Sequence, residues 1–198
     1  MSSIKLKHAS GNGVIIAAPS SNPAADRTIT LPSTADGTML TTTNPKAGNI
    51  LQVKQTVKSD VSTISIATTA LSSDIMTVSI TPQSASSKIL LQCSLNTSCS
   101  TTSVGFVFQR DSTDIAIADA NGSRQRRTSS QTAPSGTIVN LNGSFLDSPS
   151  TTSAITYRVK ACHTSGSSQN VVINDNGQSE QAKFMNSICT LTAMEVAG

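Results

Sequence analysis

Apolar and polar residues alternate along most of the chain after position 50, which is the pattern of half-buried β-strands. The clearest apolar stripe consists of Ile89, Leu91, Cys93 and Leu95, spaced two residues apart. The alternation predicts strands at 51–58, 63–68, 74–80, 87–96, 104–110, 113–118, 136–147, 154–164, 170–174 and 184–196. In the first strand, Leu51, Val53, Gln55 and Val57 share one face, and Gln52, Lys54, Thr56 and Lys58 share the other.

The last predicted strand, 184–196, carries apolar residues at both parities. This predicts burial on both faces and a place at the centre of a sheet, since such a strand would be a liability at an exposed edge. The polar stretch 119–135 has no periodicity and predicts a long loop. Many short strands with turn signals between them, and no helical period, predict an all-β antiparallel sandwich of the jelly-roll type.

The opening of the chain differs from the rest. Four short strand-like pieces (4–7, 14–18, 28–31 and 38–41) are separated by clusters of Gly, Pro, Asn and Asp. Such a meander is marginal by itself, so we expect it to be ordered by packing against its own copies or a larger assembly. An Asn-Pro break within 42–47 favours a linker. We therefore predict an N-terminal shaft or attachment segment, 1–46, and a sandwich head, 47–198.

Composition adds an expectation about assembly. Hydrophobic residues make up 36% of the 198, aromatic residues 3% and charged residues 13%. This predicts a thin core, which an extended homotrimer would supplement by burial between chains. A net charge of +3 is too weak to indicate a nucleic-acid partner. No apolar run is long enough to span a bilayer and no signal-peptide pattern is present, so we expect assembly in a cytoplasm without membrane insertion.

Four cysteines occur, at Cys93, Cys99, Cys162 and Cys189, and none forms a C-x-x-C pair. Zinc and thioredoxin-type sites are therefore poorly supported. Cysteines within strands commonly act as small apolar core residues, and we expect buried free thiols. A Cys93–Cys99 disulfide is the alternative that the sequence leaves open.

Catalytic signatures are lacking. His8 and His163 are the only histidines and no nucleophile motif accompanies them. Cys162 and His163 are adjacent in a predicted strand and should point to opposite faces. Glu180 and Glu195 do not suggest the carboxylate pair of a glycosidase. We therefore expect a non-enzymatic protein with no catalytic residues and no cofactor.

A metal site is not predicted either. Asp111, Asp114, Asp119 and Asn121 are oxygen ligands close together in the sequence. Their spacing does not match the calcium-binding loop D-x-[DN]-x-[DN]-G.

Two polar segments are candidate receptor-contact loops. The first contains Arg124, Arg126 and Arg127, whose guanidinium groups suit acidic glycans or lipopolysaccharide phosphates. A solvated loop or contacts between subunits are the plainer interpretation. The second contains Asn174, Asp175 and Asn176, at a predicted hairpin tip that would offer polar groups to sugar hydroxyls. An ordinary turn is the alternative there.

Several phrases of the sequence resemble bacteriophage tail-fibre proteins, those of cyanophages especially. They are ITLPSTADGTMLTT near the start, then GNILQVKQTVKSD, TPQSASSKILLQCSLN, FVFQRDSTDIAIAD and NSICTLTAMEVAG. The resemblance implies a trimeric all-β distal domain joined to a short shaft or virion-anchoring piece. The chain departs from long fibres in having no extended repetitive shaft and no coiled coil.

The resemblance implies a virion structural protein: a receptor-binding tail fibre that mediates host-surface adhesion as a homotrimer. The alternative is a capsid decoration or head-fibre protein. Expected partners are other phage tail or capsid proteins, bound through 1–46, and a host surface glycan or lipopolysaccharide.

Overall fold

The computed structural model describes residues 3–7, 9–17, 20, 45–99, 103–178, 181–182 and 184–198. The chain divides into two compact units, Met1–Met39 and Leu40–Gly198. In the first unit, β1 (Ser3–Lys7) and β2 (Gly13–Ala17) form an antiparallel hairpin. They correspond to the first two predicted pieces, whereas 28–31 and 38–41 lie outside the described residues.

The second unit is built from strands. They are β3 (Ile50–Lys58), β4 (Ser62–Ile66), β5 (Met76–Ile80), β6 (Lys88–Cys99), β7 (Ser103–Arg110), β8 (Thr113–Ile115), β9 (Ser129–Thr132), β10 (Val139–Asp147), β11 (Ile155–His163), β12 (Gln169–Ile173) and β13 (Cys189–Val196). None of the described residues forms a helix long and apolar enough to cross a membrane.

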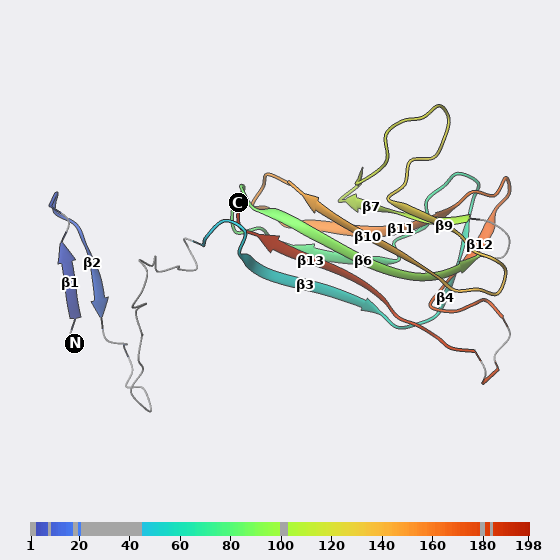
Figure 1. Cartoon of the computed structure of the whole chain (residues 1–198), viewed down its shortest axis with the longest axis horizontal. Helices are drawn as coiled ribbons and strands as arrows, with labels where there is room; N and C mark the ends of the chain where they lie inside the picture. Colours follow the sequence, from blue (N-terminus) through green and yellow to red (C-terminus); the bar gives the residue numbers. More distant parts are fainter. Residues whose placement is uncertain are drawn as a thin grey trace, which may run out of the picture. The chain divides into compact units, whose positions relative to one another are not determined.

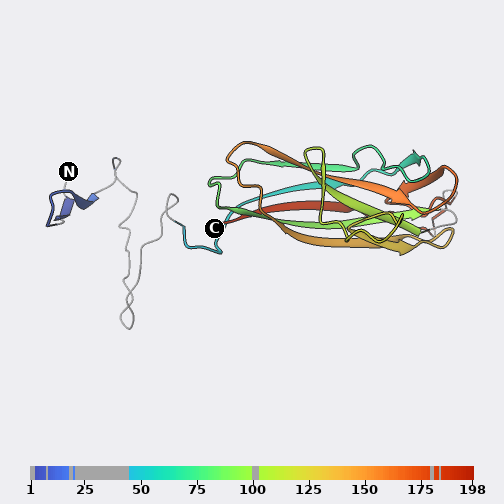
Figure 2. The same ribbon diagram turned by 90° about the horizontal axis from the view of Figure 1, so that it is seen from above.

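The strands form two antiparallel sheets stacked as a sandwich (Figures 1 and 2). One contains the order β3-β13-β6-β10, with β12 and β4 continuing beside the end of β6. The other contains β5-β11-β7-β9, with β8 also paired to β7. The eight main strands, in chain order, are β3, β5, β6, β7, β9, β10, β11 and β13. If they are numbered one to eight, the first sheet has the order 1-8-3-6 and the second has the order 2-7-4-5. This is jelly-roll order, and the predicted fold class is confirmed.

The core lies between the sheets. The predicted stripe Ile89, Leu91, Cys93 and Leu95 is buried there, with at most 5% of each residue exposed. Phe106, Phe108 and Tyr157 are the largest fully buried side chains and face it from the second sheet. Because the chain has so few aromatic residues, these three rings supply much of the apolar volume on that side.

Several strand bounds, such as those of β6, β8 and β10, differ by up to three residues from the sequence-based expectation, and two elements differ more. Strand β9 lies inside the predicted loop 119–135, because Ser103–Phe106 of β7 offers an unpaired edge to which the polar segment Ser129–Thr132 can bond. Strand β13 begins at Cys189, five residues later than predicted. It lies between β3 and β6, as expected of an interior strand, but its outward face is only half-buried.

All four cysteines are buried free thiols. Cys93 and Cys99 belong to the single strand β6, six residues apart, so their Cα atoms are separated by about 20 Å. A disulfide needs a Cα separation below about 7 Å, which excludes the Cys93–Cys99 bridge. Burial raises the pKa of the Cys93 thiol to about 12, so this group is an unreactive core residue.

Glu195 is a fully buried carboxyl on β13. The Gln52 amide donates to its Oε2 at 2.7 Å, and the Gln83 backbone N–H donates to its Oε1 at 2.7 Å. Burial by itself raises the pKa of Glu195, but the hydrogen bonds outweigh it and hold the pKa below its ordinary value. The ionised carboxylate therefore ties β13 to β3 and to the loop after β5.

We expect Glu195→Gln to reduce stability at neutral pH and to do so less as the pH falls. A carboxyl whose pKa is lowered by folding contributes stability above its unfolded pKa, about 4.3, and loses it as the pH falls through the folded pKa. Urea unfolding of both proteins at pH 7, 5, 4 and 3 measures this. A difference in unfolding free energy that stays constant over this series would contradict it.

Candidate functional site

The sandwich has a proximal end, where the chain enters and leaves it, and an opposite, distal end. At the proximal end, Gly48 N–H donates to Ala197 C=O and Ala197 N–H donates to Asn49 C=O, both at 2.8 Å. Strand β6 runs from Lys88, opposite Val196, to Cys99, opposite Val171. Its twelve residues span about 35 Å, so the turn that follows β12 lies far from the proximal end (Figure 1).

Asn174 begins this distal turn and is fully buried, with φ of 67°. Its Nδ2 donates to the backbone carbonyls of Lys58 and Asp60 at 2.9 and 3.0 Å. Its Oδ1 accepts the Cys189 thiol hydrogen at 3.0 Å. Every side-chain polar atom of Asn174 is used to join three segments. The sequence placed Asn174 on the exposed tip; its burial corrects that and makes it a structural residue.

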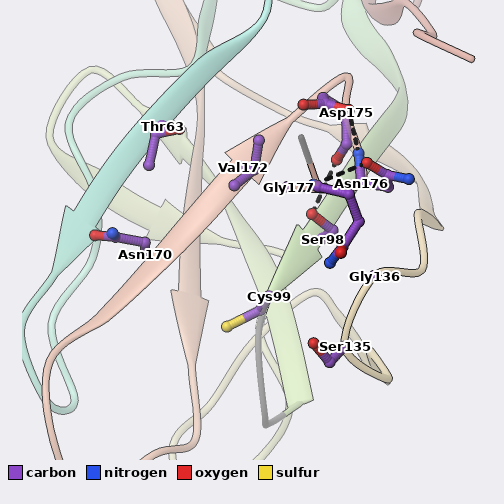
Figure 3. A pocket seen from close by; sticks show the side chains of 11 residues that line it. Thr63, Ser98, Cys99, Ser135, Gly136, Asn170, Val172, Asp175, Asn176 and Gly177 are labelled. Atoms are coloured by element: carbon purple, nitrogen blue, oxygen red, sulfur yellow. Dashed lines mark hydrogen bonds between the residues drawn. The ribbon is translucent and has the colours of Figure 1, made fainter. Parts of the chain in front are cut away.

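Asp175 and Asn176 lie on the accessible part of the turn (Figure 3). The Asn176 N–H donates to Asp175 Oδ1 at 2.6 Å, and the Gln178 N–H donates to Asn176 Oδ1 at 2.9 Å. The Ser98 hydroxyl donates to the Asp175 carbonyl at 2.9 Å. These bonds fix the backbone. Within the described part of the chain, Asp175 Oδ2 and Asn176 Nδ2 have no hydrogen-bond partner, so both groups remain for a ligand.

Two hollows flank the turn. The first, of about 460 Å³, is lined by Thr63, Ser98, Cys99, Ser135, Gly136, Asn170, Val172, Asp175, Asn176, Gly177 and Gln178 (Figure 3). The second, of about 450 Å³, is lined by Val61, Asp175, Gln178, Gln181, Ala182, Phe184 and Asn186. Asp175 and Gln178 line both. Their hydroxyls, amides and single carboxylate provide many donors and acceptors but little charge.

Phe184 gives the second hollow an apolar wall and is 36% exposed. Phe106, Phe108 and Tyr157 are fully buried and Phe145 packs against the core, so Phe184 is the one exposed aromatic side chain of the described residues. The apolar pattern predicted position 184 as the start of the last strand, so Phe184 was not among the predicted site residues. The one aromatic residue in the segment between positions 170 and 188 was the available signal.

The arginine segment lies apart from the turn. Arg127 Nε donates to Cys162 Sγ at 2.9 Å and its Nη2 donates to Gln125 Oε1 at 2.8 Å. Arg126 Nε donates to the Ala118 carbonyl. Arg126 therefore holds its own loop together, and Arg127 fastens the loop to β11. Arg124 is exposed, and no hydrogen bond of its guanidinium group is found in the described residues, so it is the member of the three that is accessible to a partner.

Cys162 and His163 point to opposite faces, as the strand alternation predicted. His163 Nδ1 accepts the Ser165 N–H at 3.1 Å, so the neutral ring carries its hydrogen on Nε2 and donates it to the Ile66 carbonyl at 2.9 Å. Cys162 instead contacts Arg127, and burial raises the pKa of its thiol although Arg127 opposes this. They therefore do not form a nucleophile–base pair. His8 lies outside the described residues.

The four residues considered as calcium ligands, Asp111, Asp114, Asp119 and Asn121, either form hydrogen bonds within the protein or are exposed. Asp111 Oδ1 accepts the Thr156 N–H at 3.0 Å, and Asp114 Oδ1 accepts from the Gln109 amide at 2.7 Å. Asp119 and Asn121 are exposed. Across the described ranges, no three His, Cys, Asp or Glu residues are grouped so that they could hold a metal ion.

Comparisons with known proteins give no family. No family model matches the chain, and no curated protein matches it. Among solved structures, the chain is similar to the infectious bursal disease virus Gx strain structure, at 12% identity and a TM-score of 0.38, covering 94% of this chain and 53% of that one. The chain is also similar to the D431N mutant VP2 protein in T=1 particles of the same virus, at 14% identity and a TM-score of 0.40, covering 94% of this chain and 43% of that one. For the VP2 subviral particle of that virus, the identity is 14% and the TM-score 0.34, and the match covers 95% of this chain and 48% of that one.

The chain thus spans about half the length of these viral proteins. At these identities and TM-scores the similarity identifies neither a family nor a function.

Proposed function

We propose that this chain is a non-enzymatic structural protein of a phage virion, a short fibre that adheres to the host surface as a homotrimer. Residues 1–46 join it to other tail or capsid proteins, and the jelly roll presents the distal end outward. The ligand class is a host surface glycan. Assembly takes place in the host cytoplasm, and adhesion requires no cofactor.

One observation carries this proposal: the sandwich is entered and left at one end, and its accessible polar turn lies at the other. The proximal end is joined to the preceding segment through Gly48 and Asn49. The distal end holds Asp175 and Asn176 between two hollows rich in hydroxyl and amide groups. A domain attached at one end and equipped with hydrogen-bonding groups at the other suits the tip of a fibre.

Adhesion would depend on the simultaneous binding of the three copies of this turn in one fibre. Asp175, Asn176 and Gln178 offer an acceptor and amide groups to sugar hydroxyls, and Phe184 offers an apolar surface to a sugar ring. Each such contact is weak on an open surface. Three copies in one fibre raise the effective concentration of the second and third contacts, so that overall binding exceeds that of one site by orders of magnitude.

Deletion of residues 1–46 tests the division of roles. We expect the remaining chain to fold with the same β-rich circular dichroism but to be absent from purified particles, because it has lost the attachment segment. Immunogold labelling of intact virions that carry the full chain provides the reference. Incorporation of the truncated chain at the full-length level would contradict the assigned role of 1–46.

The position of the gold label separates the proposal from its alternatives. Label at the tail supports adhesion. Label over the capsid instead supports a decoration or head-fibre protein and rejects adhesion. The absence of label from all particles rejects a virion role altogether.

A further inference from the structure

The outward face of the sheet β3-β13-β6-β10 carries an apolar row that crosses all four strands. Leu146 of β10 pairs with Leu90 of β6, Leu90 pairs with Met194 of β13, and Met194 pairs with Val53 of β3. Val53 is 54% exposed and Leu146 is 46% exposed, and the two residues between them are half-buried. Opposed residues on neighbouring strands lie within contact distance, so these four side chains form one continuous band.

The adjoining row is polar but uncharged. It consists of Gln55, Thr192, Gln92 and Ser144, paired across the same four strands. Gln55 Nε2 donates to Thr192 Oγ1 at 2.8 Å within this row.

The next row towards the distal end consists of Val57, Thr190, Ser94 and Asn142. Val57 is 52% exposed. We call these three rows together the neutral face, because none of their residues is charged.

The outer face of the other sheet is different. Asp74 there forms ion pairs with Arg158 and with Lys160, whose Nζ lies 3.1 Å from Asp74 Oδ1. Gln109 and Asp111 lie around the same hollow. That face has the charged character of a surface that stays in water. The same domain therefore has one outer face with ion pairs and one whose three central rows expose apolar residues and no charge, with Lys88 beyond them at the proximal end. The centre of a protein interface differs from its surroundings in the same way.

We propose that the neutral face is the surface through which a second copy of this chain binds. A face without charge meets copies of itself without like-charge repulsion, and in the proposed homotrimer the apolar rows of the three copies can meet around the three-fold axis. The three rows cover about six residues of each of the four strands and give a plan area of about 400 Å², which the standing side chains enlarge. This is about half of the roughly 800 Å² that each partner contributes to a stable interface, before the relief of the side chains is counted. The inference deepens the proposed homo-oligomer, on which it rests, by assigning its contact surface.

Introducing a negative charge into the apolar row tests the assignment. Leu146→Glu and Val53→Glu each place a carboxylate at an exposed position, where the isolated fold can tolerate it. In the assembly the same carboxylate would be buried without a partner, so we expect the dissociation constant of the oligomer to rise about a hundredfold or more. Sedimentation equilibrium of the full chain measures this. Thr77→Glu, at an exposed position on the outer face of the other sheet, is the matched control and should leave the constant unchanged.

The outcomes separate the inference from the proposed function. Dissociation by both face variants, with unchanged circular dichroism and an unaffected control, supports the inference. If the wild-type chain is oligomeric and either glutamate variant remains equally oligomeric, the neutral face is not the contact, but the homo-oligomer still stands. A wild-type chain that is monomeric at about 100 μM overturns both the inference and the homotrimer of the proposed function. Adhesion is judged independently, by the particle experiment.

Discussion

Asp147→Ala is expected to destabilise the sandwich by about 3 kcal/mol, measured as the change in unfolding free energy in urea. Asp147 ends β10, on the side of the core, and only 5% of it is exposed. Tyr157 Oη donates to its Oδ2 at 2.7 Å, and Arg110 Nη1 donates to Oδ1 and Oδ2 at 3.0 and 3.1 Å. Asp147 thus joins β10 of one sheet to β7 and β11 of the other.

The cost arises mainly from the groups that are left behind. Without the carboxylate, the Tyr157 hydroxyl is a buried donor with no acceptor, and the Arg110 guanidinium loses its counter-charge. Arg110 keeps about a third of its side chain in solvent, so its loss is smaller than that of a fully buried charge. The expected value therefore lies at the lower end of the range for broken buried pairs.

Two further variants make the measurement specific. Tyr157→Phe removes only the hydroxyl and should cost about 1 kcal/mol. Asp60→Ala removes a carboxylate whose side chain is 69% exposed in its ion pair with Lys58, and should leave the urea midpoint unchanged. If Asp147→Ala shifts the midpoint no more than Asp60→Ala does, the interaction between the sheets is not the one described here.

Phe106→Ala is the second large effect, with an expected cost of about 3–5 kcal/mol. Phe106 is fully buried on β7, and its ring packs edge-on against Phe108, with 5.2 Å between the centroids and 84° between the planes. Truncation would leave a cavity in a core that holds few other aromatic rings. Thermal and urea unfolding of the variant measure the loss, and a cost below about 1 kcal/mol would show that the core closes around the missing ring.

Gly143 explains how this ring fits and provides a test of the packing. A Cβ atom on Gly143 would lie 2.6 Å from Phe106 Cζ, closer than real contacts allow, and 3.2 Å from Phe108 Cε2, which is a tight contact. Gly143→Ala should therefore cost about 1–3 kcal/mol by overpacking. In a Phe106→Leu background the added methyl group has room, and its cost should largely vanish. Additive costs in this double-mutant cycle would contradict the proposed contact.

Several features of the fold followed from the sequence alone. The alternation at Ile89–Leu91–Cys93–Leu95 identified a core strand, and the two-sided apolar pattern near the C-terminus identified an interior one. Both signals are local, because successive side chains of a strand point to opposite faces and the burial of each face is therefore visible in the order of apolar and polar residues. The opposite directions of Cys162 and His163 also followed from this alternation.

Other features depended on which segments meet. Strand β9 is polar and has no periodicity; the unpaired edge of β7 makes it a strand. Asn174 looked like an exposed turn residue, yet its side chain is buried because the carbonyls of Lys58 and Asp60 lie beside it. Phe184 joined the candidate site only when the chain brought it beside Asp175.

The neutral face illustrates the same division. Strand alternation put Val53 and Val57 on one side of β3, and that grouping is correct. Which side meets the core was decided by the packing of β3 next to β5, where Thr56 Oγ1 donates to the Thr77 carbonyl at 2.6 Å. The apolar side was left outward, aligned with Met194, Leu90 and Leu146. The sequence by itself determined a jelly-roll-type sandwich and the periodicity of its strands. Only the tertiary structure decided which residues share the distal turn and the neutral face, because pairing between strands distant in the chain sets those neighbours.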